Sequence, residues 1–595
     1  MISYRIDVHN AQAHLYRVTL TIPAPSVTQR LSLPAWIPGS YLVREFARHL
    51  SALEAKQGSR AVSLTQLDKA TWQADCSGRA ALVVTYLVYA FDTSVRAAFL
   101  DVQRGFFNGT SLCLRVEGRE AEPHRLELRS LPRGWQVATS MTSRSAAVFE
   151  AADYDELVDH PFELGTFWCG HFKAHGVPHE LVVAGALPDF DGDRLLADTK
   201  RICDAEIAFW HGDPPNRADV PFERYVFLLN SVDDGYGGLE HRASTALIAS
   251  RRDLPRIAPA KADKAARPEE PTDGYVTLLG LISHEYFHTW NVKRLKPREF
   301  APYDYTRENY TELLWFFEGF TSYYDDLLLR RAGLIDESRY LKAIGKTIGS
   351  VLGMPGRQVQ SVAQASFDAW VKYYRGDENT PNATISYYTK GSLVALALDL
   401  SLRATTARRK ATLDDVMRGL WARSAGGPIT EADIVEVLRE IAGQAHADAM
   451  ARQLNEWVHG TGDLPLPALL KRFGVQWQGQ PATLAQRLGV RVSESALAGV
   501  KVTHVLRGSA AERAGLSAGD EVLALGDWRL RRLDDALRLI KPGQPASLLV
   551  SRDQRLLTLT LDVPEVAESV GAVSLGVDAK ASRDALALRH AWICG

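Results

Sequence analysis

Hydrophobic and polar residues alternate along much of the first third of the chain. The segments 14–22, 80–91 and 179–187 are rich in β-branched residues, alternate in part, and are separated by turn residues. Such a pattern is typical of strands, so we expect residues 1–188 to form an antiparallel β domain. The segment 34–39 begins with proline and has a second proline near its end. It predicts a loop because proline cannot continue a hydrogen-bonded ladder.

The pattern changes near residue 189, where helical periodicity takes over. We expect an α+β domain over 189–475 whose C-terminal part is mostly helical. A charged, proline-containing stretch at 258–274 interrupts it and predicts a mobile loop. The other predicted elements are a helix over 191–212, strands over 223–231 and 243–250, a long apolar helix over 275–295, and helices up to about residue 470.

Short strands and short helices mix in the last part of the chain. The pattern predicts strand, helix, turn and strand over 499–530, a helix over 533–540, and a hairpin over 546–563. This order, with Gly515 and Gly519 bracketing the turn, resembles a PDZ domain, which we place at 476–565. Such domains bind extended peptides or C-termini by strand addition, so a peptide or protein ligand is expected. The tail, 566–595, shows no readable pattern.

Composition and charge narrow the class of protein. The chain has 595 residues, of which 46% are hydrophobic and 24% charged, as in soluble globular proteins of several domains. It carries 69 Lys and Arg against 71 Asp and Glu, so no global field favours nucleic acid or an anionic membrane. No apolar run approaches the roughly 20 residues that span a bilayer, and the start lacks the features of a signal peptide. We expect a cytoplasmic protein; the oligomeric state stays open.

The five cysteines are far apart and show no Cys-x-x-Cys spacing. Neither a disulfide framework nor a cysteine-based zinc site is therefore expected.

A metal-binding pattern lies in the apolar helix predicted over 275–295. His284 and His288 are four residues apart, so they share one helical face and can both bind one Zn²⁺. Glu285 lies one position round the helix, where a general base for a bound water belongs. The alternatives are a chance match and an ordinary surface pair. The apolar flanks argue against both, because buried polar groups need partners and a metal supplies one.

A third ligand is expected about thirty residues further on. In the apolar helical segment 311–326, Glu318 is the only charge between Glu312 and Asp325. A buried carboxylate in such a run needs a metal or an ion pair, and an interior salt bridge is the alternative. Ser322 shares a helical face with Glu318 and is a candidate to hydrogen-bond a ligand imidazole. We therefore expect one Zn²⁺ per chain.

These motifs together resemble a known family. The histidine motif followed by the Trp-Phe-Phe-Glu-Gly-Phe string resembles the gluzincin metallopeptidases, especially their aminopeptidase branch. The fuller strings at 284–297, 34–49 and 154–167 resemble the glycyl-aminopeptidase family. The resemblance spans nearly the whole chain. It implies an N-terminal β domain, a thermolysin-like zinc peptidase domain and a C-terminal PDZ domain.

Further site residues are implied by this resemblance. Gly237, Gly238 and Glu240 match the exopeptidase Gly-x-x-Glu signature, in which the turn and strand run along the substrate backbone and the glutamate pairs with the free α-ammonium group. Where the aminopeptidase relatives carry Asn, this chain has His241. The alternative is that the glycines only form a hairpin turn and Glu240 is solvated.

The resemblance also implies an oxyanion donor. Residues 387–391 match a Tyr-x-Lys-Gly element, which assigns that role to Tyr388, with Tyr387 beside it. The alternative is a pair of aromatic residues that only packs at a helix start.

The expected function is a zinc aminopeptidase that acts on peptides with a free N-terminus. The resemblance implies a preference for small first residues, Gly or Ala. Two alternatives stay open: a zinc endopeptidase, and a PDZ-bearing binding or chaperone-like protein whose zinc is structural.

Overall fold

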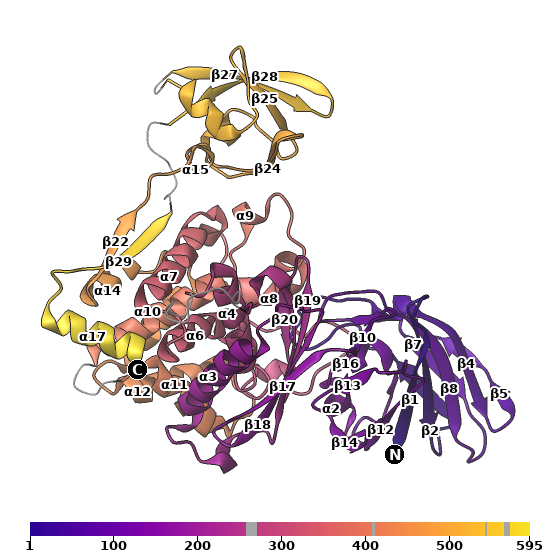
Figure 1. Ribbon diagram of the computed structural model, residues 1–595. Coiled ribbons are helices and arrows are strands. Elements are labelled where there is room, and N and C mark those ends of the chain that lie inside the picture. The colour runs from indigo at the N-terminus through magenta and orange to yellow at the C-terminus, as the bar shows by residue number, and fades with distance from the viewer. Residues whose placement is uncertain (258–269, 407–410, 542–543, 565–571) are drawn as a thin grey trace. The chain divides into compact units, whose positions relative to one another are not determined.

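Alternating burial follows the alternating sequence in the first part of the chain. In β2 (Leu15–Ile22), Tyr16, Val18, Leu20 and Ile22 are fully buried, and the residues between them are partly exposed. The computed structural model in Figure 1 describes residues 1–257, 270–406, 411–541, 544–564 and 572–595. Most of the stretch predicted as a mobile loop, 258–274, lies outside the described residues.

Contacts divide the chain into two units. The first contains Met1–Asn309 and Trp421–Ile429, and the second contains Tyr310–Leu420 and Thr430–Gly595.

The N-terminal strands of the first unit form three sheets. The largest has eight strands in the order β14-β15-β12-β1-β2-β8-β4-β5. Its neighbours are antiparallel except β1 and β12, which run parallel. Two four-stranded sheets contribute to the same core. The first has the order β13 (Gln136–Ala138), β16 (Phe162–Gly165), β10 (Arg104–Phe107) and β9 (Ala98–Leu100), and the second has the order β11 (Arg115–Val116), β3 (Thr28–Ser32), β7 (Thr71–Asp75) and β6 (Leu64–Gln66). The predicted N-terminal β domain is confirmed. The strands of the large sheet are β14 (Thr142–Ser145), β15 (Val148–Ala151), β12 (His124–Arg129), β1 (Ile2–Asn10), β2, β8 (Leu82–Tyr89), β4 (Leu50–Gln57) and β5 (Arg60–Val62).

A fourth sheet of the first unit has five strands in the order β17-β18-β19-β21-β20. One face packs against the helices α3 and α4. On the other face, Val182, Val226 and Leu228 belong to the core of the N-terminal sheets. Strands β17 and β18 precede residue 188, the expected domain boundary, yet they pair with this sheet. The elements are β17 (Trp168–Ala174), β18 (Val177–Ala184), α3 (Gly192–His211), β19 (Tyr225–Val232), β20 (Tyr236–Glu240), β21 (Ser244–Ser250) and α4 (Asp273–Phe287).

Helix α4 is shorter than predicted. It starts at the cap residue Thr272, whose hydroxyl accepts a hydrogen bond from the Tyr275 amide, and it ends at Phe287. The predicted continuation to residue 295 is wrong. Val292 has a φ of +109°, and the Lys293 side chain is buried in an ion pair with Asp159. A straight helix cannot adopt that backbone angle, so a tertiary contact overrides the local apolar pattern.

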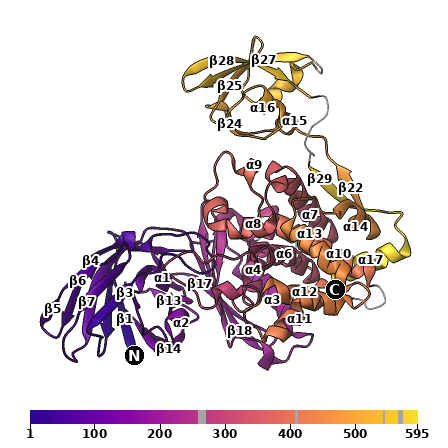
Figure 2. The same ribbon diagram turned by 180° about the vertical axis from the view of Figure 1, so that it is seen from behind.

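The second unit begins as a helical assembly. Its α10 is buried along most of its length and packs closely on α6. In the rear view of Figure 2, α12 and α13 lie side by side. The helical region predicted to about residue 470 is confirmed. The main helices are α5 (Leu314–Phe317), α6 (Gly319–Arg331), α7 (Glu337–Leu352), α10 (Thr389–Thr405), α12 (Glu431–Ala442), α13 (Ala447–His459) and α14 (Leu466–Arg472).

A small β domain with its own core completes the second unit, and it confirms the predicted PDZ order. The tail that had no readable pattern forms strand β29 (Val573–Val577) and helix α17 (Arg583–Cys594) over its described part. β29 pairs with β22 (Val475–Gly479), so these two strands flank the PDZ domain in the sequence. The domain consists of α15 (Leu484–Leu488), β23 (Val490–Ser495), β24 (Gly499–Val505), α16 (Ala510–Arg513), β25 (Glu521–Leu525), β26 (Trp528–Arg529), η7 (Leu533–Arg538), β27 (Pro545–Arg552) and β28 (Arg555–Asp562).

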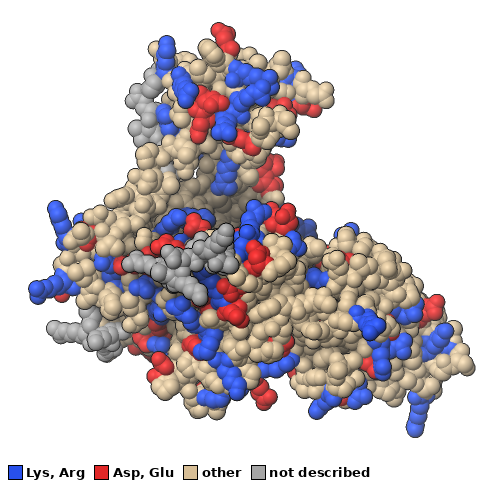
Figure 3. All heavy atoms as spheres, in the orientation of Figure 1, with Lys and Arg blue, Asp and Glu red and all other residues tan. Residues whose placement is uncertain are grey.

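Surface and helix properties agree with the composition. On the face drawn in Figure 3, basic and acidic side chains are interspersed. In the described part of the chain, no helix is both long enough and apolar enough to cross a membrane.

Candidate active site

The two motif histidines face each other at the end of α4. Their Nε2 atoms are 3.0 Å apart, and the rings meet edge to face with centroids 4.6 Å apart. His288 Nδ1 lies 2.8 Å from the Asn291 carbonyl, and only an Nδ1–H can donate to that oxygen. With the proton on Nδ1, Nε2 carries the lone pair that can bind a cation, as in histidine zinc ligands. Because α4 ends at Phe287, the chain can turn and place the Asn291 carbonyl beside the His288 ring.

Glu285 packs directly on strand β20. Its side chain is 5% exposed, and it lies so close to Gly238 that a Cβ at that position would stand 2.1 Å from the Glu285 Oε1. Only glycine allows this approach. The Gly238 carbonyl on the same strand accepts a hydrogen bond of 3.0 Å from Arg96 Nη2. Gly237, with a φ of +154°, takes a backbone conformation that side chains disfavour. Both glycines of the signature thus allow the backbone of β20 to pass close to Glu285. Arg96, which hydrogen-bonds to this strand, is a residue of the site that sequence reasoning missed.

Glu240 is buried at the end of the same strand, with 4% of its surface exposed. The predicted loop at 34–39 lies against it. A Cβ on Gly39, whose φ is +94°, would stand 2.5 Å from the Glu240 Oε1. The alternative in which Glu240 is solvated therefore does not hold. The N-terminal domain forms part of the wall around this carboxylate.

A buried ion cluster supports the segment after Glu240. Asp159 Oδ1 lies 2.8 Å from Lys293 Nζ and 3.4 Å from His241 Nδ1, and the Arg242 amide donates to Asp159 Oδ2 at 2.9 Å. Burial alone would raise the pKa of Asp159, but Lys293 and Arg242 hold it well below its usual range. Sequence reasoning missed Asp159 and Lys293. Asp159 lies in the string 154–167 and Lys293 in the string 284–297, and both strings resemble the family. This resemblance was the signal from which the two residues could have been found.

In the second unit, Glu318 is 2% exposed and stands between α5 and α6, where the helix is interrupted. The residue after Glu318 is Gly319, and a glycine is required there because α10 packs very close to the start of α6. A Cβ on Gly319 would stand 2.6 Å from the Cα of Gly391. These two glycines let the helices approach closely and so place the start of α10, which follows Tyr388, near Glu318.

Tyr388 and Tyr387 stack on each other, with ring centroids 4.7 Å apart. The Tyr388 hydroxyl is 3.1 Å from that of Tyr374. Burial and the negative charge of Glu318 raise the pKa of Tyr388 well above its usual value. The phenol therefore keeps its proton at neutral pH and can donate a hydrogen bond. Tyr387 is fully buried, whereas Tyr388 retains some exposure.

Ser322 follows Glu318 by one helical turn, and its amide donates to the Glu318 carbonyl at 2.8 Å. Its side chain lines a small hollow with Asp326 and Ser392. Its expected bond to an imidazole stays a prediction.

Three family models match the chain in sequence order. They are the Peptidase M61 N-terminal domain over residues 3–166, the M61 glycyl aminopeptidase over 277–394, and a PDZ domain over 486–563. No curated protein matches the chain.

Solved structures show similarity over longer stretches. An aminopeptidase N family protein from Idiomarina loihiensis is 38% identical, with all of both chains covered and a TM-score of 0.90. Two structures of an M1 zinc metallopeptidase from Deinococcus radiodurans, one with a Tyr-Ser-Ala substrate, are each 15% identical. They cover 78% of this chain and 95% of the other, with TM-scores of 0.46 and 0.44.

The domain order, the three family-model matches and the 38% identical relative define a zinc metallopeptidase of the aminopeptidase type. The chain belongs to the M61 glycyl aminopeptidase family.

Proposed function

We propose that the protein removes single residues from the N-terminus of peptides by zinc-dependent hydrolysis. The observation that carries this proposal is the arrangement on β20. Gly238 packs on the proposed base Glu285, and Glu240, two residues later, is a buried carboxylate. Residues i and i+2 of a strand share one face, so Glu240 and the Gly238 position that contacts Glu285 line the same side of β20. Glu240 can therefore hold the α-ammonium group while the first peptide bond lies near Glu285.

The proposed ligands of one Zn²⁺ per chain are His284, His288 and Glu318. The donor set fits zinc, since two imidazole nitrogens and a carboxylate are its usual ligands in peptidases. Two Nε2 atoms facing each other at 3.0 Å need a cation or a proton between them, which supports the same assignment. When bound, zinc would polarise the scissile carbonyl and make water a better nucleophile.

The chain's own residues would carry out the proton transfers and the positioning. Glu285 accepts a proton from the attacking water and passes it to the leaving amine. Tyr388 donates a hydrogen bond to the oxygen that becomes negative. Glu240 binds the substrate ammonium group, and the Gly237–Gly238 backbone runs beside the substrate. The substrates are peptides with a free N-terminus.

We further propose a preference for Gly or Ala as the first residue. The family description supports it. So does the close approach of Gly39 to Glu240, because a loop that touches the ammonium anchor restricts the space beside the first side chain.

The PDZ domain is proposed to bind a peptide or protein ligand by strand addition at β23, an edge strand of its sheet.

The test uses matched peptides that start with free Gly, free Leu or N-acetyl-Gly, with products identified by mass spectrometry. Loss of one residue from the free-Gly peptide, slower loss of Leu, and no cleavage of the acetylated peptide are expected. Internal cleavage of the acetylated peptide would establish an endopeptidase and remove the role of Glu240. No cleavage of any peptide by the zinc-loaded protein would favour a binding protein with a structural zinc.

A further inference from the structure

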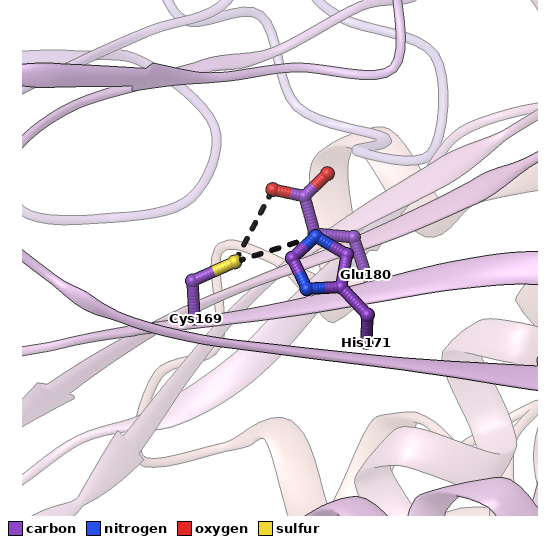
Figure 4. Close-up of side chains that lie close together, drawn as sticks. All are labelled: Cys169, His171 and Glu180. Carbon is purple, nitrogen blue, oxygen red and sulfur yellow. Dashed lines mark hydrogen bonds between the residues drawn. The ribbon is translucent and has the colours of Figure 1, made fainter.

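A second group of metal-ligating side chains lies on the β17–β18 hairpin of the five-stranded sheet. The antiparallel register places His171 directly opposite Glu180. Cys169 precedes His171 by two residues, so it projects from the same face of β17. Figure 4 shows the three side chains pointing toward one another.

The distances fit one small cation. The Cys169 Sγ lies 3.5 Å from Glu180 Oε1 and 3.9 Å from His171 Nε2. One ligand atom from each residue lies within 4.8 Å of the others. Around tetrahedral zinc, bonds of about 2.3 Å to sulfur and about 2.0 Å to nitrogen place these two atoms about 3.5 Å apart. Small rotamer changes would therefore bring all three ligands onto one ion.

This group is on the opposite side of the sheet from the motif histidines. The neighbouring residue His179 bonds through Nε2 to the Tyr286 hydroxyl of α4, at 2.8 Å. Successive side chains of a strand alternate between faces, so Glu180 projects away from α4. The group is thus not an extension of the proposed catalytic site.

The donor chemistry selects the type of metal. A thiolate, an imidazole and a carboxylate suit Zn²⁺ or Co²⁺, whereas Mg²⁺ and Ca²⁺ prefer oxygen ligands alone. Arg224 Nη1 is 3.9 Å from Glu180 Oε2, so this guanidinium faces the carboxylate oxygen that the metal would not use. The Cys169 thiol is exposed, which gives an ion access from solvent.

We propose that Cys169, His171 and Glu180 form a second transition-metal site, which binds Zn²⁺ through three protein ligands and leaves a fourth position to water. The ion would join β17, an edge strand, to β18. The expectation that this chain has no cysteine-based zinc site rested on the absence of Cys-x-x-Cys spacing. The proposed site needs no such spacing, because the pairing of β17 with β18 brings Glu180 beside Cys169 and His171.

The first test loads the full-length protein with Co²⁺ and records its absorption. A thiolate-to-cobalt charge-transfer band in the near ultraviolet is expected, since the His284, His288 and Glu318 set contains no sulfur. The band should disappear in Cys169→Ser, weaken in His171→Ala and Glu180→Gln, and remain in Cys594→Ser, which changes the other exposed cysteine. Bound zinc after gel filtration should fall from two ions per chain to one in Cys169→Ser.

A second measurement uses the unmodified protein. Zinc should slow alkylation of Cys169 by a maleimide at least tenfold, as mapped by peptide mass spectrometry, and leave the alkylation of Cys594 unchanged. The proposal is overturned if cobalt gives no thiolate band, if the band survives Cys169→Ser or both ligand changes, or if zinc does not protect Cys169. None of these readouts requires peptide hydrolysis, so they are independent of the proposed aminopeptidase activity.

Discussion

Glu285 lies against Gly238 so closely that even a methyl group on that glycine would overlap the carboxylate, at 2.1 Å from Oε1. One glycine on a strand therefore determines where the proposed general base of the neighbouring helix can stand.

The change Gly238→Ala should displace the Glu285 carboxylate and lower kcat. General acid–base catalysis contributes about 10²–10⁴ in rate, so a partial displacement should cost about tenfold to a hundredfold. Steady-state kinetics on a free-Gly peptide, with bound zinc measured in parallel, would show this. Gly462→Ala is the control, because a Cβ at Gly462 meets no atom within 4 Å. Equal kcat in the two variants would contradict the proposed role of the contact.

The change Glu285→Gln keeps the size of the side chain and removes its basicity. We expect kcat to fall by about 10²–10⁴ while zinc content stays unchanged, because Glu285 is not among the proposed ligands. Turnover at the wild-type rate would remove Glu285 from the mechanism. Loss of zinc together with activity would instead make it a ligand.

Two stacked tyrosines offer a matched pair of variants for the oxyanion donor. Tyr388→Phe should lower kcat by about 10²–10³, the usual effect of losing one such donor. Tyr387→Phe removes the same hydroxyl from the adjacent ring and should leave kcat within about twofold of wild type. The measurement is kcat of both variants on the same free-Gly peptide. If Tyr387→Phe lost more activity than Tyr388→Phe, the oxyanion donor would be Tyr387.

Glu240→Gln tests the recognition of the substrate ammonium group. Charge-assisted bonds are about twice as strong as neutral ones, so kcat/KM for free-Gly peptides should fall by about 10²-fold. Circular dichroism and zinc content should be unchanged. If kcat/KM for the free-amine peptide stayed at the wild-type value, the proposed anchor would have to be another residue.

Lys296 should make stability depend on alkaline pH. Burial lowers its pKa from 10.5 to about 8, and the charges of Lys293 and Arg242 add to this effect. Between pH 8 and pH 10.5 the unfolded chain therefore binds more protons than the folded one, so stability from this group rises with pH across that window. Below about pH 8 its full destabilising effect, about 3 kcal/mol, is present.

The comparison for Lys296 uses denaturant unfolding at pH 7.5 and pH 9.5. Lys296→Met should be more stable than wild type at pH 7.5, and the difference should shrink by about 2 kcal/mol at pH 9.5. Lys346→Met, at an exposed lysine, should show no such change. A difference that does not vary with pH would contradict a lowered pKa for Lys296.

Local periodicity alone was sufficient for several elements. The spacing of His284 and His288 brings both imidazoles to one side of the end of α4, because His288, the cap residue after the helix, keeps helical backbone angles. The alternation along 14–22 likewise predicted strand β2, and the strand and turn order at 499–563 predicted the PDZ domain. These properties depend on neighbours within a few residues, so the sequence by itself determined them.

Tertiary structure decided the rest. Gly39 meets Glu240 across 200 residues, Asp159 pairs with the segment that ends α4, and strand pairing gathers Cys169, His171 and Glu180. No local pattern predicts such contacts, because they depend on which strands pair and which segments pack together. The apolar run to residue 295 favoured a longer helix, but the buried pair of Asp159 and Lys293 accompanies a turn instead. Packing across the whole unit outweighs local preference at such positions.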